Sequence, residues 1–388
     1  MLRNRILESY YNEIACDKDA AGYLNSQKKS YPKKFLFKVG KVINFSQLKY
    51  KIFFSCCLLY EKVWWLLYVY IVARFVLSNF IKPRRSDFLE KALNIGFTES
   101  KKTSYDFSLT GISPILEVGL TYRNLASYCT LKDKCSALSL AFSVIYGVQS
   151  SKKERTKLVF SSLKLHLNDV YKIAMYTVLI VKLKSCRINV LLNSHYERWT
   201  YLASQIAGEK LVLVQHGRLK EGITFVHKLG IINRLYCYND KSYKAYLNYY
   251  SIIRDYQYIK PKLTLTHIGD SSKKNIFIAS SIVAVDKEIA FIKGLLALSR
   301  KLINIVVYVK LHPLYDYAHQ YDEVSDRVVF LDKNSYPYAD YMVTYNSALG
   351  DEYLALEQRV LFLEEYESIE EAVELVLKSL IEDQKAFC

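Results

Sequence analysis

Hydrophobic and polar positions divide the chain into three zones. The first zone, which ends near residue 100, contains an aromatic-rich apolar segment from Ile52 to Leu77, interrupted by the charges of Glu61, Lys62 and Arg74. Its longest uncharged run, Val63–Ala73, has 11 residues and is too short to cross about 30 Å of hydrocarbon as a helix. The pattern therefore predicts an apolar helix and argues against a multipass membrane protein.

In the second zone, short β-branched apolar runs alternate with helical periodicity. The alternation predicts strands over 188–192, 211–214 and 234–238, and helices over 162–184, 196–207 and 240–250. Strands and helices that alternate at this spacing favour right-handed βαβ units, and such units build a parallel sheet.

The third zone repeats the alternation after a polar linker. The pattern predicts strands over 275–279, 305–311, 328–331, 341–344 and 360–363, with helices over 286–301 and 347–356. Ser368 and Glu371 fit a capping box that begins a last helix. We therefore expect a basic, helical, partly apolar region at 1–100, then one doubly wound α/β domain at 101–268 and another at 269–388.

The charge of the chain is uneven. Lys and Arg number 54 against 38 Asp and Glu, a formal charge of +16. Residues 28–85 hold 13 bases and one acid, whereas residues 351–388 hold 11 acids and 3 bases. A basic block around an aromatic, apolar helix is typical of a segment that lies in the plane of an anionic membrane surface. A buried core helix with a basic outer face and a tilted membrane span are the alternatives that the sequence leaves open.

Composition argues against two kinds of binding site. Thirteen glycines in 388 residues are about half the usual ~7%, which disfavours a glycine-rich phosphate loop. The eight cysteines form no Cys-x-x-Cys pair and no metal-ligand spacing with the seven histidines. We therefore expect free thiols in a reducing cytoplasm and no bound metal. The first 30 residues contain no apolar h-region of a signal peptide.

Polar residues gather at the ends of five predicted strands, where open parallel sheets bind ligands. In chain order they are Asn193, Ser194, His195 and Glu197; Gln215, His216, Gly217 and Arg218; Ser280 and Ser281; Lys310, His312 and Pro313; and Asn346 and Ser347, with Glu352 on the next helix. Titratable and hydroxyl side chains at five strand ends exceed what packing requires, so we treat them as candidate site residues.

His216 is the main candidate for catalysis. An imidazole suits general-base work near neutral pH, and Gly217 permits a tight exit from the preceding strand. Gln215, Gly217 and Arg218 are the candidates for contacts with an acceptor or a phosphate. His195 and Glu197, at the neighbouring strand end, are the second candidates for catalysis. A purely structural histidine is the alternative reading of His216.

Ser347 is predicted to begin a helix. Its hydroxyl and the free amides of the first turn make an anion site without glycine, although an ordinary N-cap has the same pattern. His312 is placed to donate a hydrogen bond to a phosphate, and Lys310 adds positive charge; a structural histidine is again the alternative. Glu352, just over one turn along, is placed to reach a ribose hydroxyl or to complement the helix dipole.

Together these motifs resemble a group of bacterial surface-polysaccharide glycosyltransferases with the GT-B fold. The resemblance rests on Val212–Gly217, Val309–Pro313 and Tyr345–Leu356, and it covers roughly residues 185–365. The group includes capsule and O-antigen transferases, Kdo transferases, polysialyltransferases and CDP-glycerol glycerophosphotransferases. There, a His-Pro motif and a serine-rich motif hold the donor nucleotide, which implies that role for His312 and Ser347. Their neighbours in a donor site would be Lys310, Pro313, Asn346, Glu352, Ser280 and Ser281.

The resemblance implies two Rossmann-like domains that face a cleft, no metal or cofactor, and a nucleotide-sugar donor, with CMP- and CDP-linked sugars favoured. We expect transfer to a growing polysaccharide or a lipid-linked acceptor by a cytoplasmic enzyme, peripheral at the inner face of the plasma membrane, without a nucleic-acid partner. The hypothesis is that His216 deprotonates the acceptor in an inverting displacement. A nucleotide-sugar epimerase of the same fold and an inactive membrane-associated binding protein are the alternatives.

Overall fold

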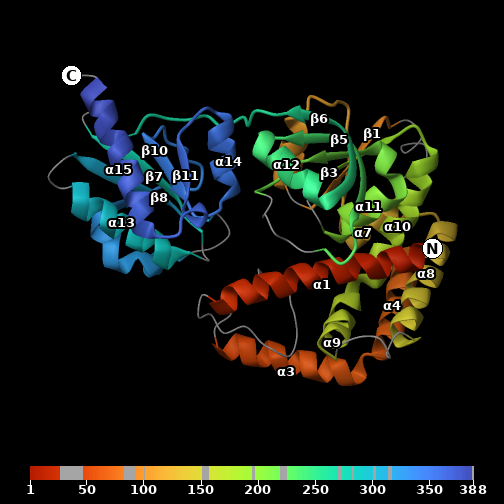
Figure 1. The fold of residues 1–388 in the computed structure, drawn as a ribbon. Helices are drawn as coiled ribbons and strands as arrows, with labels where there is room; N and C mark the ends of the chain where they lie inside the picture. Colours follow the sequence, from red (N-terminus) through yellow and green to blue (C-terminus); the bar gives the residue numbers. More distant parts are fainter. Residues whose placement is uncertain are drawn as a thin grey trace. The chain divides into compact units, whose positions relative to one another are not determined.

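Two compact units make up the chain. The computed structural model describes residues 1–26, 47–82, 92–99, 101–150, 157–194, 197–218, 225–268, 273–281, 284–299, 303–312 and 317–386. The first unit is Met1–Cys237 with Tyr243–Gln257, and the second is Tyr238–Ser242 with Tyr258–Cys388. Each unit contains one β-sheet with flanking helices (Figure 1).

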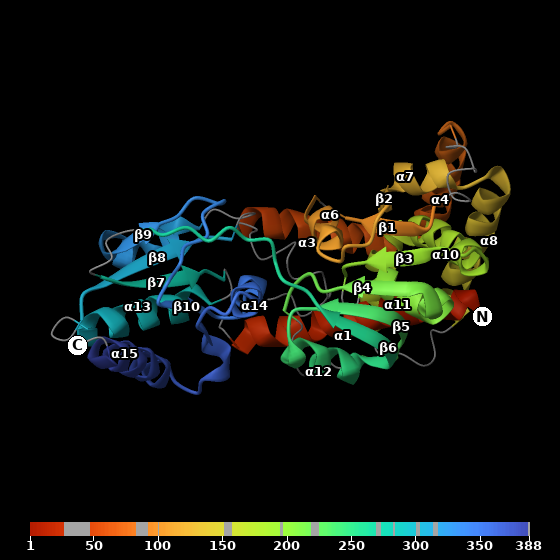
Figure 2. The same ribbon diagram turned by 90° about the horizontal axis from the view of Figure 1, so that it is seen from above.

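The sheet of the first unit has six strands in the order β2-β1-β3-β4-β5-β6 (Figure 2). They are β1 (Asn94–Thr98), β2 (Leu116–Gly119), β3 (Asn189–Leu192), β4 (Leu211–Val214), β5 (Leu229–Cys237) and β6 (Tyr250–Tyr258). From β2 to β5 every neighbouring pair is parallel, which confirms the βαβ prediction. The sequence pattern identified β3, β4 and the end of β5 but missed the other three strands.

The helices of the first unit supply most of its core. They are α6 (Lys101–Ser108), α7 (Tyr122–Tyr128), α8 (Leu131–Ser150), α9 (Lys157–His166), α10 (Val170–Ser185) and α11 (Arg198–Ala207), with α12 (Asp240–Tyr249) between β5 and β6. Helix α10 buries residues all round, from Val170 to Leu183, and contacts both α8 and α11. The single helix predicted over 162–184 is thus two helices, α9 and α10, joined by a 3₁₀ turn at Leu167–Asp169.

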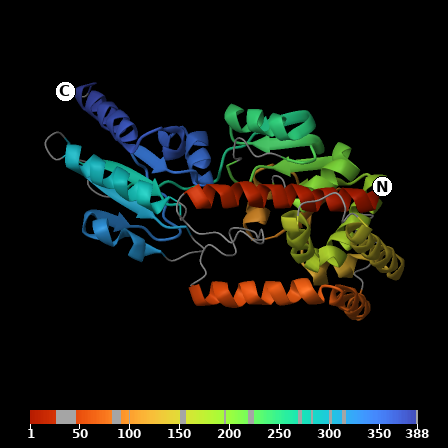
Figure 3. The same cartoon turned by 60° about the horizontal axis from the view of Figure 1, so that its bottom comes forward.

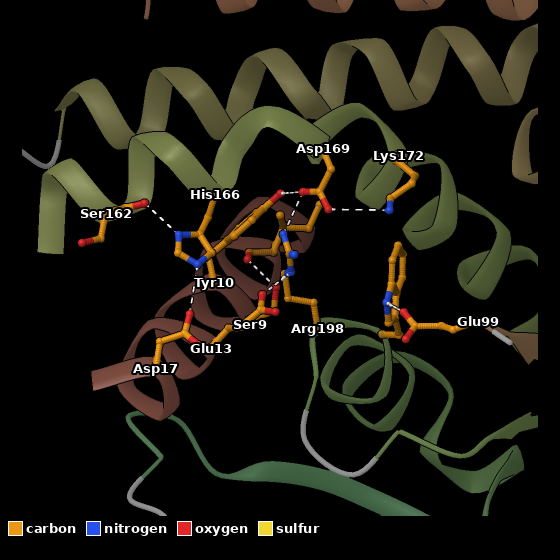
Figure 4. Close-up of polar contacts among 12 residues, drawn as sticks. Ser9, Tyr10, Glu13, Asp17, Glu99, Ser162, His166, Asp169, Lys172 and Arg198 are labelled. Atoms are coloured by element: carbon orange, nitrogen blue, oxygen red, sulfur yellow. Dashed lines mark hydrogen bonds and ion pairs between the residues drawn. The ribbon is translucent and has the colours of Figure 1, made fainter. Parts of the chain in front are cut away.

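A long N-terminal helix, α1 (Leu2–Ser26), lies against α8, α9 and α11 (Figure 3). A polar cluster fixes it there (Figure 4). Arg198, the first residue of α11, forms ion pairs with Glu13 of α1 and, at 2.7 Å, with Asp169. The Tyr10 hydroxyl donates to the same Asp169 oxygen at 2.8 Å, and the Arg198 guanidinium lies 4.6 Å from the centre of the Tyr10 ring.

Burial makes this cluster electrostatically strong, because little water screens its charges. Burial raises the pKa of the Tyr10 hydroxyl well above its ordinary value, and the nearby charge of Asp169 raises it further. For Arg198 burial acts to lower the pKa, but Asp169 and Glu13 outweigh it, so the pKa is raised and the guanidinium stays charged. Helix α1 is therefore held to the sheet-covering helices by buried charge as well as by apolar packing.

The apolar segment of the first zone forms two helices, α3 (Gln47–Val63) and α4 (Leu66–Asn79). The structure includes both in the first unit, where α3 contacts α9, and α4 contacts α8 and α10. Among the described helices, none is long and apolar enough to cross a membrane by itself; Leu48–Val63 and Leu66–Asn79 meet that criterion only as a pair, with a bend of 93° between them.

The second unit has five strands in the order β11-β10-β7-β8-β9, all paired in parallel. They are β7 (Lys274–Ala279), β8 (Ile305–Lys310), β9 (Val328–Phe330), β10 (Tyr341–Thr344) and β11 (Val360–Phe362), with helices α13 (Val285–Ser299), α14 (Ala348–Ala355) and α15 (Ile369–Ala386). A 3₁₀ segment, η4 (Ala318–Arg327), precedes β9. All five strands agree with the sequence prediction to within one residue at each end.

Packing in the second unit explains this agreement. Strand β7 in the middle of the sheet buries its last four residues, so it reads as a continuous apolar run rather than an alternating one. Helix α15 contacts α13, and the Ser368 hydroxyl accepts from the amide of Glu371 at 3.1 Å, as the predicted capping box requires. The prediction of two parallel, doubly wound α/β domains is thus confirmed; that they face a cleft stays a prediction.

Candidate functional site

Three neighbouring strands of the first sheet bring polar side chains together at their carboxyl ends. His216 follows β4, Asn193 follows β3, and Asp106 lies on α6, the helix after β1. His216 Nδ1 lies 2.7 Å from Asp106 Oδ2, and Asn193 Nδ2 donates to that same oxygen at 2.9 Å. We call these three residues the His216 cluster.

Local packing fixes each member of the His216 cluster. A Cβ atom on Gly96 of β1 would lie 2.4 Å from Phe107 Cε2, so the glycine lets α6 pack directly on the strand and places Asp106 beside its end. The amide of Gln215 donates to the Tyr236 carbonyl at 2.8 Å, which extends the β4–β5 ladder by one residue. His216 is therefore the first residue that the sheet releases.

The geometry assigns a tautomer to His216. A carboxylate only accepts hydrogen bonds, so Nδ1 carries the proton that points at Asp106, and Nε2 is the nitrogen that can take a proton from a substrate. The Asp106 side chain is completely buried, whereas that of His216 is 42% exposed. The second carboxylate oxygen, Asp106 Oδ1, is buried and has no hydrogen-bond partner within the described part of the chain.

This arrangement has the chemistry of a general base. A buried carboxylate holds the ring in one orientation and stabilises the imidazolium that forms when the ring takes a proton. Because Asp106 is shielded from water, its attraction for that imidazolium is stronger than it would be at the surface. Because the His216 side chain is 42% exposed, a substrate hydroxyl can approach the ring. The His216 cluster is thus equipped to deprotonate an alcohol.

The other candidates of the first unit have separate positions. Gln215 is fully buried and its side-chain amide donates to the Gly217 carbonyl at 3.1 Å, so it shapes the turn that carries His216. Gly217 and Arg218 are half-buried. Glu197 is the N-cap of α11, and its charge raises the pKa of buried Tyr250, after burial itself. His195 lies outside the described residues.

The second unit has its own polar group, at the carboxyl ends of β7, β8 and β10. Ser281 Oγ donates to Asn346 Oδ1 at 3.4 Å, and the amide of Ser280 donates to the Lys310 carbonyl at 2.9 Å. The His312 side chain is exposed, while its amide donates to the Tyr317 hydroxyl at 3.0 Å. The structure therefore brings these predicted donor residues to one edge of the sheet; Pro313 lies outside the described residues.

A buried carboxylic acid stands behind that edge. Glu288 Oε2 accepts from the hydroxyls of Tyr321 and, at 2.8 Å, Ser280, and Oε1 accepts from the Ser281 amide at 2.8 Å. Tyr317 donates to Ser280 Oγ at 3.1 Å. Burial raises the pKa of Glu288 to about 7, against the opposing effect of these hydrogen bonds. Glu288 thus anchors the two serines and changes charge near neutral pH.

Lys310 and Glu352 are coupled to each other inside the unit. The Lys310 ammonium donates to the Ser335 carbonyl at 2.9 Å and lies 3.5 Å from the centre of the Tyr336 ring. Both Lys310 and Glu352 are buried. Burial lowers the pKa of Lys310 to about 8, and the Glu352 charge counteracts this. In the structure both side chains lie inside the second unit. Their predicted roles beside the phosphate and the ribose of a donor stay predictions.

Ser347 is the N-cap of α14, as predicted: its hydroxyl accepts from the Leu349 amide at 3.3 Å. The amide of Ser347 itself donates to the buried hydroxyl of Thr344 at 3.1 Å. Ser347 and Asn346 are both half-buried, at the same edge as Ser281. The anion-binding role of this helix end stays a prediction.

Sequence reasoning missed Asp106, Glu288, Tyr317 and Tyr321, and it named Asn193 without a role. Asp106 follows a strand that contains Asn94 and Gly96, two residue types that are depleted in strands, so the sequence pattern predicts neither this strand nor a site at its end. The sequence does contain a signal for Glu288. This acid lies in the first turn of the helix that follows the Ser280–Ser281 strand end, so its side chain can reach back to the two serines.

Three comparisons relate the chain to known proteins. No family model matches the chain, and no curated protein matches it. One similar solved structure is UDP-GlcNAc 2-epimerase from Neisseria meningitidis bound to UDP-GlcNAc. The match has 12% sequence identity and a TM-score of 0.37, and it covers 76% of this chain and 90% of that chain. Another is a mutant O-GlcNAc transferase from Thermobaculum terrenum: 13% identity, 77% of this chain, 61% of that chain, and a TM-score of 0.36. At these TM-scores, the fold assignment rests on the two sheets of the chain itself.

Proposed function

We propose that this protein is a glycosyltransferase of the GT-B type that takes a sugar from a nucleotide-sugar donor and passes it to a hydroxyl of a saccharide or lipid-linked acceptor. The observation that carries the proposal is the His216 cluster: a half-exposed imidazole backed by a fully buried carboxylate at the carboxyl edge of a parallel sheet. The resemblance of three sequence motifs to surface-polysaccharide transferases supports the same reading.

In this reaction His216 is the general base of an inverting displacement. Nε2 takes the proton of the acceptor hydroxyl while the hydroxyl oxygen forms a bond to the anomeric carbon of the donor sugar. The bond from that carbon to the phosphate oxygen breaks, and the nucleotide leaves with the electron pair. Asp106 holds the imidazole and balances the positive charge that develops on it.

The second unit is proposed to hold the donor nucleotide. The exposed imidazole of His312 and the first turn of α14 beyond Ser347 offer hydrogen-bond donors to the departing phosphate. Ser280, Ser281 and Asn346 line the same edge of the sheet. Donors of this kind take the place of a cation in stabilising a leaving phosphate, and we therefore propose that the transfer needs no metal.

The finer assignments follow the resemblance. We propose a CMP- or CDP-linked donor, an acceptor that belongs to a capsule or O-antigen polysaccharide, and a location at the cytoplasmic face of the plasma membrane. A lipid-linked acceptor would give the enzyme a reason to lie at a membrane, which an epimerase acting on one soluble substrate lacks.

A panel of nucleotide sugars tests the proposal. The protein is incubated with CMP-, CDP- and UDP-linked sugars, with and without oligosaccharide or polyprenyl-phosphate-linked acceptors, and released nucleotide and sugar products are measured. Release of one nucleotide class that an acceptor accelerates supports a transferase. Conversion of the donor to a sugar epimer without an acceptor would instead identify an epimerase, and failure to bind any nucleotide sugar would contradict both.

A further inference from the structure

The outer face of α3 and α4 is unusually apolar for a surface. Its exposed large side chains include Ile52, Leu59, Trp65, Val69, Leu77 and Phe80, which are 56–80% exposed. In α4 the buried residues are confined to one stripe, Leu67, Ile71 and Ser78. A helix that is apolar all round is normally buried all round, yet here one stripe is packed and most of the remaining residues are exposed.

The stripe that faces the protein is firmly attached. Lys134 of α8 donates to the Ser78 carbonyl at 2.6 Å, and the hydroxyls of Ser78 and Tyr171 lie 3.3 Å apart. Tyr68 packs on Phe142 with ring centres 5.6 Å apart. Because these contacts fix α4 on α8 and α10, its outer face cannot rotate inward to bury the exposed side chains.

The charge around this face is positive. Between residues 47 and 82 there are five bases, Lys49, Lys51, Lys62, Arg74 and Lys82, and one acid, Glu61. The Glu61 carboxylate accepts from the Ser161 hydroxyl at 2.5 Å, so it is engaged with α9. Arg74 lies 5.0 Å from the centre of the exposed Tyr70 ring, and Trp65, which precedes α4, is exposed as well. Cationic side chains for the headgroups and amphipathic aromatic rings for the interface are the combination that anionic lipid surfaces attract.

The dimensions favour lying on a membrane over crossing it. Helix α3 has 17 residues and α4 has 14, about 25 Å and 21 Å at ~1.5 Å per residue, and both are shorter than the ~30 Å hydrocarbon core. The 93° bend and the attachment of α4 to α8 and α10 prevent the two from acting as one straight span.

From these observations we infer that the α3–α4 face is a docking surface for an anionic lipid bilayer, into which Trp65, Val69 and Phe80 insert to interfacial depth. The bases listed above contact phosphate headgroups, and the rest of the first unit stays outside the lipid. This inference does not rest on the proposed activity, since binding to vesicles needs neither donor nor acceptor.

Vesicle flotation with the full chain tests the docking surface. The wild-type protein is mixed with vesicles of phosphatidylcholine alone or with phosphatidylglycerol added, and the bound fraction is measured at low and high salt. We expect binding that needs phosphatidylglycerol, weakens with salt and falls about fivefold for each of Lys49 and Lys51 changed to Gln. The double variant Trp65→Glu and Val69→Glu should lose binding by more than about tenfold.

A matched control separates the face from general surface polarity. Leu298 on α13 is 52% exposed, close to the 56% of Trp65, and Leu298→Glu should bind vesicles like the wild type. Circular dichroism and light scattering are recorded for each variant. The inference is overturned if the wild type does not bind anionic vesicles, if the double variant binds them as well as the control does, or if the wild type is a dimer that the double variant dissociates while vesicle binding is absent.

Discussion

At the scale of single residues, His216 owes its proposed role to a neighbour 110 positions away in sequence. The Asp106 side chain is completely buried, so it cannot contact a substrate directly and acts only through His216. Asp106 is therefore a positioning residue. Its contribution is to select the tautomer with a proton on Nδ1 and to stabilise the charged ring. Both contributions depend on its negative charge rather than on its shape.

We therefore expect Asp106→Asn to lower kcat by about 10²–10⁴-fold while KM for the donor changes little. The asparagine retains the size of the side chain, but it presents an amide to His216 and no longer fixes the tautomer. The pH–rate profile is the readout that a merely structural role would not move: the acidic limb, where the base becomes protonated and inactive, should change in Asp106→Asn. Ser108→Ala, on the exposed side of the same helix, is the control and should leave kcat and the profile unchanged. An unaltered kcat in Asp106→Asn would contradict a positioning role for Asp106.

The raised pKa of buried Glu288 should make the stability of the second unit depend on pH. Its pKa is near 4.5 when unfolded and about 7 in the folded protein, so between these values the folded state binds more protons. The contribution of Glu288 to stability is thus complete below about pH 4.5 and is lost as pH rises through 7. With ~1.4 kcal/mol per pH unit, the loss is on the order of 3 kcal/mol.

The measurement is the free energy of unfolding of the second unit from pH 4.5 to 8, in wild type and in Glu288→Gln. Glutamine resembles the protonated acid, so the variant should lose most of this slope and be the more stable protein at pH 8. Glu374→Gln, at an exposed position of α15, should retain the wild-type slope. A Glu288→Gln protein with an unchanged slope would contradict the buried-acid interpretation.

At the scale of elements, helix α1 is held by charge pairs that differ sharply in burial from those on the surface. Arg198 lies among Glu13, Asp169 and Tyr10 with its side chain 10% exposed, whereas Arg254 pairs with Glu209 with side chains 48% and 69% exposed. Removing one member of a buried cluster leaves the others charged and without compensation, while water replaces the partner of a surface charge.

Arg198→Ala should therefore destabilise the first unit by about 3–5 kcal/mol, and Arg254→Ala by less than about 1 kcal/mol. Urea unfolding followed by tryptophan fluorescence measures both, because Trp199 adjoins Arg198. Arg198→Met, which retains part of the side-chain volume, tells whether the loss comes from charge or from a cavity. Equal destabilisation by Arg198→Ala and Arg254→Ala would show that the cluster contributes no more than a surface pair.

The same scale explains which elements the sequence could predict. Strand β4 is buried at every position and β7 at its last four, so their apolar runs predict both strands, with His216 and Ser280 at their ends. Strand β1 was missed because Asn94 and Gly96 break its apolar run, although Gly96 is the residue that lets α6 place Asp106. The apolar pattern over Ile52–Leu77 predicted one helix, but not its division into α3 and α4 with a 93° bend, nor the face that packs.

At the scale of the whole molecule, the alternation of strands and helices in the sequence predicts the two parallel sheets. It predicts only part of the candidate site. Strand ends indicate which side chains are candidates, but pairing such as His216 with Asp106 depends on the order of strands in the sheet, and no local pattern encodes that order. Likewise, the position of Lys310 before His312 predicts added positive charge at the donor site, and only the structure shows that the side chain is buried and packs on Tyr336.

The central claim is that His216 removes a proton from an acceptor hydroxyl, and acceptor-dependent nucleotide release tests it most directly. Initial rates are measured at saturating donor for wild type, His216→Ala and, as a control at an exposed histidine of the second unit, His319→Ala. We expect His216→Ala to lose about 10²–10⁴-fold in kcat with donor affinity retained, and His319→Ala to match the wild type. A His216→Ala protein that transfers sugar at the wild-type rate would contradict the role of His216 as the base.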